Sequence, residues 1–263
     1  YRSIFKQKTG EWEKESPLTG PTETEADLAR HIRKLGNPTL VTDATGKVWL
    51  FYVTVSVGGW SGGSINYRTS IDDGAHFGPA KRLVTTPFFN ISTLVRTTPI
   101  LYRDGTLGLP VYHELFGKFG ELLRIGPDGA VLDKIRISWG RSSLQPSIVP
   151  IDGIRGMAFL RYSGEETPKR ILTSYTADGG QSWSPTEKLT FPNPNSSVMG
   201  LRLHDGTLLL VFNNSEKNRG DLSLAKSVDN GKQWKIVHTF EGATLPANEN
   251  RELSYPSLIQ AED

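Results

Sequence analysis

The sequence predicts an all-β fold, namely a β-propeller of four-stranded blades. Three observations support this prediction: two sequence repeats and a scarcity of helical segments. A phrase of the form hydroxyl-x-Asp-x-Gly-x-x-aromatic occurs three times, as SIDDGAHF, TADGGQSW and SVDNGKQW. A strand–turn–strand pattern recurs about every fifty residues, the period of propeller blades. Most of the chain alternates short apolar runs with turn signals, which indicates short strands.

The three phrases predict the same tight turn. Asp and Ser or Thr side chains bond to nearby backbone groups, glycine supplies a positive φ, and the aromatic ring packs beneath the turn. One such phrase would indicate an ordinary hairpin turn. Three in one register predict a repeated module, and RIGPDGAVL, with Asp128 and Gly129, is a degenerate copy between the first two. The motif residues are Ser70, Asp72, Gly74 and Phe77, then Thr176, Asp178, Gly180 and Trp183, then Ser227, Asp229, Gly231 and Trp234.

The second repeat predicts one hairpin per blade. Its four copies are LVTDATGKVWLFYVTV, ILYRDGTLGLPVYHE, IVPIDGIRGMAFLRYSG and LRLHDGTLLLVFNNS, with turn glycines Gly46, Gly105, Gly153 and Gly206. A unit of about fifty residues with two hairpins is typical of a four-stranded blade. The chain then holds about four whole blades. YRSIFKQKTGEW and SYPSLIQAED resemble pieces of further blades, so we expect residues 1–263 to be one propeller domain truncated at both ends.

One stretch, TETEADLARHIRKLG, has helical character. Thr22 and Glu25 have the spacing of a capping box, and Leu28, Ile32 and Leu35 form an apolar stripe. Gly36 and Pro38 provide the stop. The pattern predicts a short surface helix within a loop.

Composition limits the function. The chain has 263 residues, Lys+Arg 30 against Asp+Glu 28, and no cysteine. This charge balance argues against a nucleic-acid partner, and no apolar run approaches the roughly 18 residues of a membrane span. The five histidines show no metal-binding spacing, and no glycine-rich phosphate loop is present. We therefore expect no metal and no cofactor.

The repeat also predicts where a ligand would bind. In a propeller the innermost strands line a central channel, so equivalent positions of different blades surround one cavity. The starts of these strands carry Asn37, Thr98, Gln145 and Tyr255, each before a proline, and the ends of the inner hairpins carry Tyr112, His113, Glu114, Arg161, Asn213 and Asn214. This polar set suits a hydroxylated, anionic ligand.

Structural roles stay open for the same residues. His113 and Glu114 also suit the cap of a strand end, and Arg161 an ion pair with Glu165 or Glu166. Asn213 and Asn214 are common turn residues. Tyr255 would equally suit core packing with a satisfied hydroxyl.

With these residues in view, the chain resembles the sialidase (neuraminidase) superfamily, in its bacterial sialidase-like branch. The three phrases look like that superfamily's Asp-box, or BNR, repeats. Further resemblance lies in LGNPTLVTD, LPVYHELFGKFGELLRI, LQPSIVP, FPNPNSSVMGLRLHDGTLLLVFNN and ELSYPSLIQ. The resemblance covers essentially the whole chain. It implies a six-bladed propeller, with the boxes on hairpins away from the active site, and a secreted or periplasmic protein.

Members of that superfamily hold the substrate carboxylate with three arginines, and use a Tyr–Glu pair as nucleophile and an Asp as acid/base. A tyrosine nucleophile is a known exception among glycosidases. Tyr255 stands where the resemblance places the nucleophile, whereas Asn195 and Asn213 stand where it places the Glu and one arginine. The general acid and first arginine would come before Tyr1, and the last arginine after Asp263.

The leading hypothesis is a sialidase-like glycoside hydrolase that acts on an acidic or polyhydroxylated terminal sugar. We expect Tyr255 to be the nucleophile or acid/base, and Glu114 or His113 to carry protons. Arg161 and Arg96 would bind a carboxylate, and Asn37, Gln145, Asn195, Asn213 and Asn214 would bind hydroxyl groups. The alternative is a non-catalytic carbohydrate-binding propeller, and a third possibility is a protein-interaction scaffold. We expect a monomer whose partner is a carbohydrate.

Overall fold

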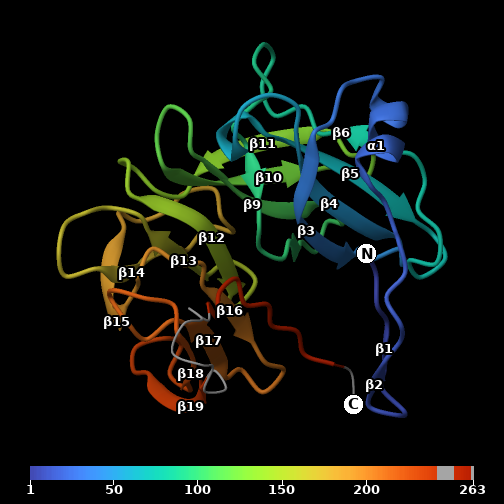
Figure 1. The fold of residues 1–263 in the computed structure, drawn as a ribbon. Coiled ribbons are helices and arrows are strands. Elements are labelled where there is room, and N and C mark those ends of the chain that lie inside the picture. The colour runs from blue at the N-terminus through green and yellow to red at the C-terminus, as the bar shows by residue number, and fades with distance from the viewer. Residues whose placement is uncertain (242–251, 262–263) are drawn as a thin grey trace, which may run out of the picture.

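Four antiparallel sheets follow one another along the chain and stand around a common centre, as Figure 1 shows for the computed structural model. The structure describes residues 1–241 and 252–261. The sheets are the blades of a β-propeller, so the predicted all-β fold is confirmed. Four blades lie in the described residues, and the count of six stays a prediction for a longer chain.

Each blade contains four antiparallel strand positions, and the second blade divides its inner position between two short strands that both pair with β9. The first blade has β3 (Lys34–Thr42), β4 (Val48–Val55), β5 (Ser64–Ser70) and β6 (Lys81–Arg82), and the second has β7 (Leu94–Val95), β8 (Ile100–Leu101), β9 (Leu107–His113), β10 (Phe119–Ile125) and β11 (Val131–Arg136). The third blade has β12 (Ser143–Pro150), β13 (Gly156–Tyr162), β14 (Arg170–Thr176) and β15 (Glu187–Pro192), and the fourth has β16 (Met199–Arg202), β17 (Leu208–Phe212), β18 (Asp221–Ser227) and β19 (Lys235–Glu241).

The four predicted inner hairpins are present, and their turns share one hydrogen-bond pattern. In each turn an aspartate Oδ1 accepts a hydrogen bond of 2.8 to 3.0 Å from a backbone N–H two residues later. The four aspartates are Asp43, Asp104, Asp152 and Asp205. This local bonding explains why the Asp/Gly turn recurs in every blade.

The three hydroxyl–Asp phrases form a second set of turns, at the ends of β5, β14 and β18. In the third blade the Thr176 hydroxyl donates to Asp178 at 2.8 Å and accepts from Gly180 N at 3.0 Å. Asp178 in turn accepts from Ser182 N at 2.9 Å. Ser70 and Ser227 make the same bonds in the first and fourth blades. The degenerate copy at Asp128 occupies the corresponding β10–β11 turn.

The core lies between neighbouring blades. Trp49 and Phe51 stack at a centroid distance of 5.8 Å and pack with Leu109 of the next blade. Phe159 and Phe212 are fully buried in a second cluster between the third and fourth blades. Burial of each large apolar side chain contributes roughly 1.5–3 kcal/mol, so these contacts fix the angle at which adjacent blades meet.

The helix is shorter than predicted. Helix α1 covers Pro21–Leu28, and Gly20 precedes it without a side-chain cap, so the predicted Thr22–Glu25 capping box is wrong. Pro21 occupies the first turn, where its missing N–H costs nothing. Leu35 lies in β3 opposite Thr54, because sheet pairing competes for the residues that complete the apolar stripe.

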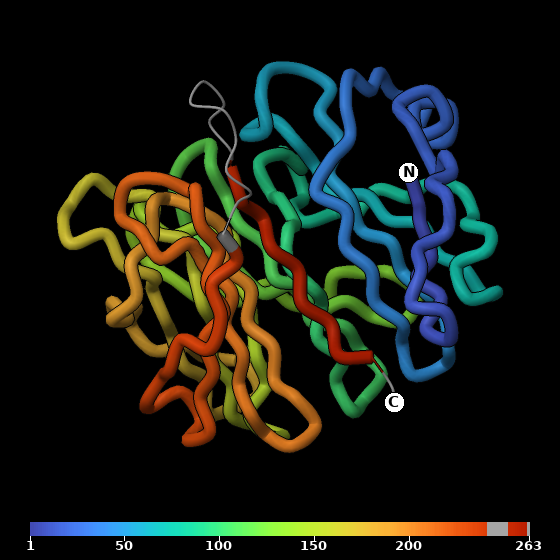
Figure 2. The backbone as a smooth tube through the Cα atoms, turned by 60° about the horizontal axis from the view of Figure 1, so that its bottom comes forward, coloured from blue at the N-terminus to red at the C-terminus, as the bar shows by residue number. Residues whose placement is uncertain are grey.

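Two described segments, one before the first blade and one after the last, lie outside the blades. Strands β1 (Phe5–Lys6) and β2 (Glu11–Trp12) form a separate hairpin, and a short 3-10 helix, η1 (Trp60–Gly62), follows β4. Residues 252–261 contain no described strand and run between the first and last blades (Figure 2). No described helix is long and apolar enough to cross a membrane.

Candidate active site

A residue with a left-handed backbone recurs at the site, within the inner strands of two blades and outside the strands at two further positions. Asn37, Gln145, Asn195 and Tyr255 all have a positive φ, between 51° and 59°. The strand register shifts beside Asn37 and Gln145. Such bulges redirect side chains, and positive φ in a non-glycine residue is a strained conformation that clusters at functional sites. Three of the four residues precede a proline, which cannot donate to the ladder and is tolerated at a bulge.

Polar side chains from three blades meet at Tyr112. Its hydroxyl accepts hydrogen bonds from Asn37 Nδ2 at 3.2 Å and from Gln145 Nε2 at 3.3 Å. Arg161 continues the network, because its Nη1 donates to Gln145 Oε1 at 3.3 Å and its Nε to Asn195 Oδ1 at 2.7 Å. Residues of different blades that are distant in sequence therefore converge, as the repeat predicts.

Two further arginines flank Tyr255. Arg96 Nη2 donates to the Tyr255 carbonyl at 2.6 Å, and its guanidinium lies 5.2 Å from the centroid of the tyrosine ring. The guanidinium of Arg219, in the β17–β18 loop, lies 5.9 Å from the same centroid. Arg219 also donates to the Asn195 carbonyl at 2.6 Å. We call these residues the axial cluster: Asn37, Arg96, Tyr112, Gln145, Arg161, Asn195, Arg219 and Tyr255.

The residues in and near the axial cluster differ from one another in exposure and in the direction of their pKa shifts. Tyr255 is 44% exposed, whereas Tyr112 is buried. Burial raises the pKa of Tyr112 to about 12 and lowers the pKa of Arg96. Burial also raises the pKa of Glu114, while Arg161 and Lys118 oppose that shift. Tyr112 is therefore a neutral hydrogen-bonding group, and Glu114 keeps its proton to a higher pH than an ordinary glutamate.

A cleft of about 800 Å³ opens beside the axial cluster. Arg96, Thr97 and Thr98 line one part, and the first blade and residues Ser257 and Ile259 line others. Its size suits a sugar ring with its substituents. Of the axial cluster, Arg96 lines this cleft. The three arginines, the exposed phenol and the amides of the cluster are groups that can bind a carboxylate and hydroxyl groups.

The family of the chain follows from a match over its full length. The model of the BNR repeat-like domain family matches residues 1–263. The chain belongs to this family. No curated protein matches the sequence significantly.

Solved structures similar to this BNR-repeat protein include sialidases. A Hadza microbial sialidase, Hz136, superposes with a TM-score of 0.69 at 17% identity, over 91% of this chain and 51% of that structure. A Trypanosoma rangeli sialidase mutant with trans-sialidase activity superposes with a TM-score of 0.68 at 13% identity, over 96% of this chain and 44% of that structure. A Dyadobacter fermentans protein of unknown function superposes with a TM-score of 0.63 at 14% identity, over 87% of this chain and 69% of that structure. The fold is thus a sialidase-like propeller, and the chain spans about half the length of the sialidase structures.

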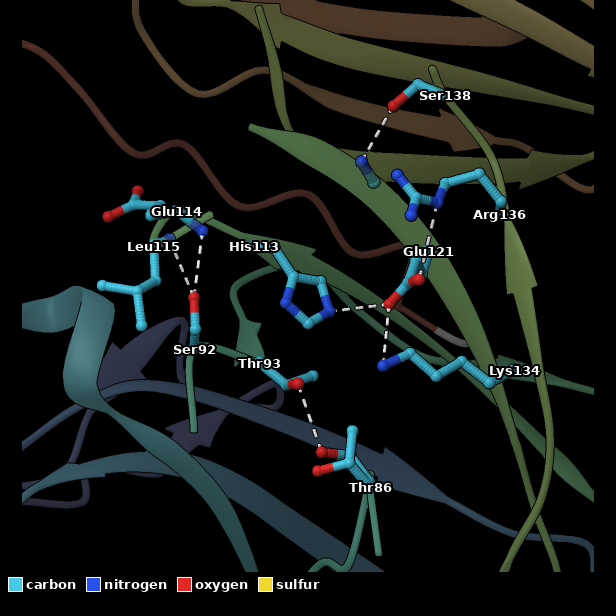
Figure 3. Close-up of polar contacts among 12 residues, drawn as sticks. Thr86, Ser92, Thr93, His113, Glu114, Leu115, Glu121, Lys134, Arg136 and Ser138 are labelled. Atoms are coloured by element: carbon cyan, nitrogen blue, oxygen red, sulfur yellow. Dashed lines mark hydrogen bonds and ion pairs between the residues drawn. The ribbon is translucent and has the colours of Figure 1, made fainter. Parts of the chain in front are cut away.

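His113 and Glu114 separate in the BNR-repeat protein, because His113 is the last residue of β9 and Glu114 begins the loop that follows. Figure 3 shows His113 directed toward Glu121, with Glu114 on the other side of the strand. His113 Nε2 lies 2.7 Å from Glu121 Oε2, and the imidazole stacks on Phe119. Lys134 also pairs with Glu121, at 3.1 Å. His113 thus belongs to an ion-pair cluster within the second blade, apart from the axial cluster.

Asn213 and Asn214 have different environments. Asn213 is fully buried, and its amide donates to the Leu253 carbonyl at 2.7 Å and to the Asp221 carbonyl. Asn213 therefore anchors the segment that carries Tyr255. Asn214 is exposed, with no hydrogen bond among the described residues. Arg161 faces the axial cluster, while Glu165 pairs with Lys169.

Sequence reasoning missed Arg219 and Glu252. These residues form an ion pair, and Arg219 O also accepts from Leu253 N at 2.8 Å. Arg219 lies in the loop SEKNRGD, which looks like a solvated run of charges and has no fixed place in the repeat. Among residues 1–241 and 252–261, no group of three or more acidic or histidine side chains could hold a metal ion.

Proposed function

We propose that the BNR-repeat protein is a sialidase-like glycoside hydrolase that acts on an acidic terminal sugar. One observation carries the proposal: Arg96, Arg161 and Arg219 gather with a half-exposed Tyr255 at the convergence of the blades. Arginine binds carboxylates in a bidentate manner, so this cationic group favours an anionic substrate.

The roles follow from exposure and charge. Tyr255 acts as the nucleophile because its phenol is accessible and two guanidiniums lie near its ring. A phenol carries no charge that would repel an anionic sugar. Glu114 supplies the proton that the leaving oxygen requires, since burial raises its pKa and so favours the protonated form, against the opposing charges of Arg161 and Lys118. Asn37 and Asn195 bind sugar hydroxyls, while the buried Gln145 holds Tyr112 and Arg161 in place.

The test is turnover of acidic aryl glycosides by the wild type and Tyr255→Phe. The substitution removes only the phenolic oxygen, so we expect loss of turnover with substrate binding retained. Tyr175→Phe is the matched control, because Tyr175 is similarly exposed but lies on β14 of the third blade. Turnover by Tyr255→Phe at the wild-type rate would contradict the nucleophile role.

A carbohydrate-binding propeller without catalysis is the second candidate. It is favoured by the lack of any carboxylate bonded to the Tyr255 hydroxyl within the described part of the chain, and by Asn195 and Asn213 at two places where the resemblance implies a Glu and an Arg. A glycan-binding array measured beside the hydrolysis panel separates the candidates. Saturable binding of acidic glycans without release of any aglycone would select the binding protein.

A further inference from the structure

A second cleft, of about 400 Å³, opens on the propeller face opposite to the axial cluster, and we call it the lower cleft. Its walls are the turns of the inner hairpins of the second and third blades, the hydroxyl–Asp turn of the third blade, and Arg202 of the fourth. Strand β9 leads from this face to the axial cluster over seven residues, a rise of roughly 23 Å. The two sites are therefore separate.

The lower cleft carries an excess of positive charge. Arg103, Arg155 and Arg202 line it, against a single carboxylate, Asp152. Asp152 is already paired with Arg155, at 2.6 Å between Oδ2 and Nε. In the described residues, neither Arg103 nor Arg202 has a carboxylate within 4.0 Å. The Asp205 carboxylate lies near enough to Arg202 for their charges to interact, without ion-pair contact. Neither guanidinium is therefore held by an ion pair, and both can contact an external anion.

The guanidiniums of Arg103 and Arg202 each lie close to a glycine of an inner-hairpin turn. A Cβ on Gly153 would lie 3.8 Å from Nη2 of Arg103, which reaches over from the preceding blade. A Cβ on Gly206 would lie 3.2 Å from Nη2 of Arg202. The small residues let the arginines pack against backbone, which lowers the entropy that they would lose on binding a ligand.

Apolar groups complete the cleft. Ile154 is 60% exposed and Leu101 is 47% exposed. The Trp183 indole forms part of the wall, with its Nε1 donating to the Gly180 carbonyl at 3.2 Å. Such surfaces contact the C–H face of a ring, while the arginines contact an acid group.

We propose that this lower cleft binds a carboxylated sugar residue, with Arg103 and Arg202 on the carboxylate and Ile154 and Trp183 against the ring. The cleft volume lies within the range of small-ligand sites, about 300–1,000 Å³. Arginine recognises carboxylates by paired N–H bonds. The site is independent of the proposed hydrolysis, because none of its residues belongs to the axial cluster.

The test is an NMR titration with glucuronate that follows the indole N–H signals. Trp183 lines the cleft, and Trp234 makes the same indole bond in the fourth blade without lining it, so Trp234 is an internal control. We expect the Trp183 signal to shift saturably while the Trp234 signal stays unchanged. Glucose serves as the uncharged sugar control in the same titration, and sulfate serves as the control anion without a sugar ring.

Arg103→Gln and Arg202→Gln should each weaken glucuronate binding about tenfold, the effect of losing one charge-assisted contact. Arg141→Gln, an exposed arginine elsewhere, should have no effect. Tyr255→Phe should also leave the titration unchanged, which separates this proposal from the hydrolase. The proposal is overturned if the Trp183 signal does not move, if glucose binds as well as glucuronate, or if sulfate binds as tightly as glucuronate.

Discussion

Arg96 donates a 2.6 Å hydrogen bond to the carbonyl of Tyr255, which lies 159 residues later in the chain. The same guanidinium lies near the tyrosine ring. The contact joins the second blade to the segment at the end of the described chain. It therefore makes the position of the proposed nucleophile depend on the propeller being assembled.

Asn213→Ala should loosen the segment that carries Tyr255. The substitution leaves the Leu253 and Asp221 carbonyls without their buried donor. We expect a loss of about 1–3 kcal/mol in the free energy of unfolding, measured by urea denaturation. Asn214→Ala is the control and should change stability little, since Asn214 is exposed. Equal effects of the two substitutions would contradict the anchoring role.

The hydroxyl–Asp turns should make stability depend on pH in the acid range. Hydrogen bonds from Ser182 and Thr176 lower the pKa of Asp178 to about 2. A lowered folded-state pKa contributes stability that is complete above the unfolded value, about 3.9, and is lost as pH falls through the folded value. Unfolding free energies of wild type and Asp178→Asn should therefore converge between about pH 4 and pH 2. A constant difference across that window would refute the assignment.

Glu114 should set the alkaline limb of the activity profile if it is the proton donor. Activity then falls as pH rises through its raised pKa, because the carboxylate can no longer donate. Lys118 lowers that pKa, so Lys118→Gln should move the alkaline limb of kcat/KM to higher pH. Movement to lower pH, or none, would argue against Glu114 as the donor.

His113→Gln should retain turnover while destabilising the second blade. His113 contacts Glu121, whose carboxylate is buried and is also paired with Lys134. Losing a bond to a charged group costs about 1.5–3 kcal/mol in the free energy of unfolding. Thermal denaturation and hydrolysis, measured on one preparation, separate the two effects. Loss of turnover without loss of stability would indicate that His113 has a role in catalysis and would contradict its structural assignment.

The propeller could be predicted because its turns are local. An aspartate that bonds to the backbone two residues later leaves the same letters in each blade, whatever the rest of the blade does. The helix was extended too far because Leu35 fits both a helical stripe and strand β3. Pairing with β4 decides between them, and a single-segment pattern does not contain that information.

The site was only partly predictable for a related reason. Arg161 and Gln145 occupy repeated strand positions and Asn195 lies just before β16, so their meeting follows from the repeat. Arg219 reaches the axial cluster from a loop, where neither its position nor its direction repeats between blades. Asn213 looked like a ligand-binding amide, yet complete burial makes it an anchor of the backbone.

The central claim is that Tyr255 performs chemistry at the convergence of the blades. It is tested most directly by the hydrolysis rate and the ligand affinity of Tyr255→Phe on one acidic aryl glycoside, with Tyr175→Phe beside it. We predict that Tyr255→Phe binds the glycoside with near wild-type affinity and does not cleave it, while the control cleaves it normally. Undiminished cleavage by Tyr255→Phe would contradict the account.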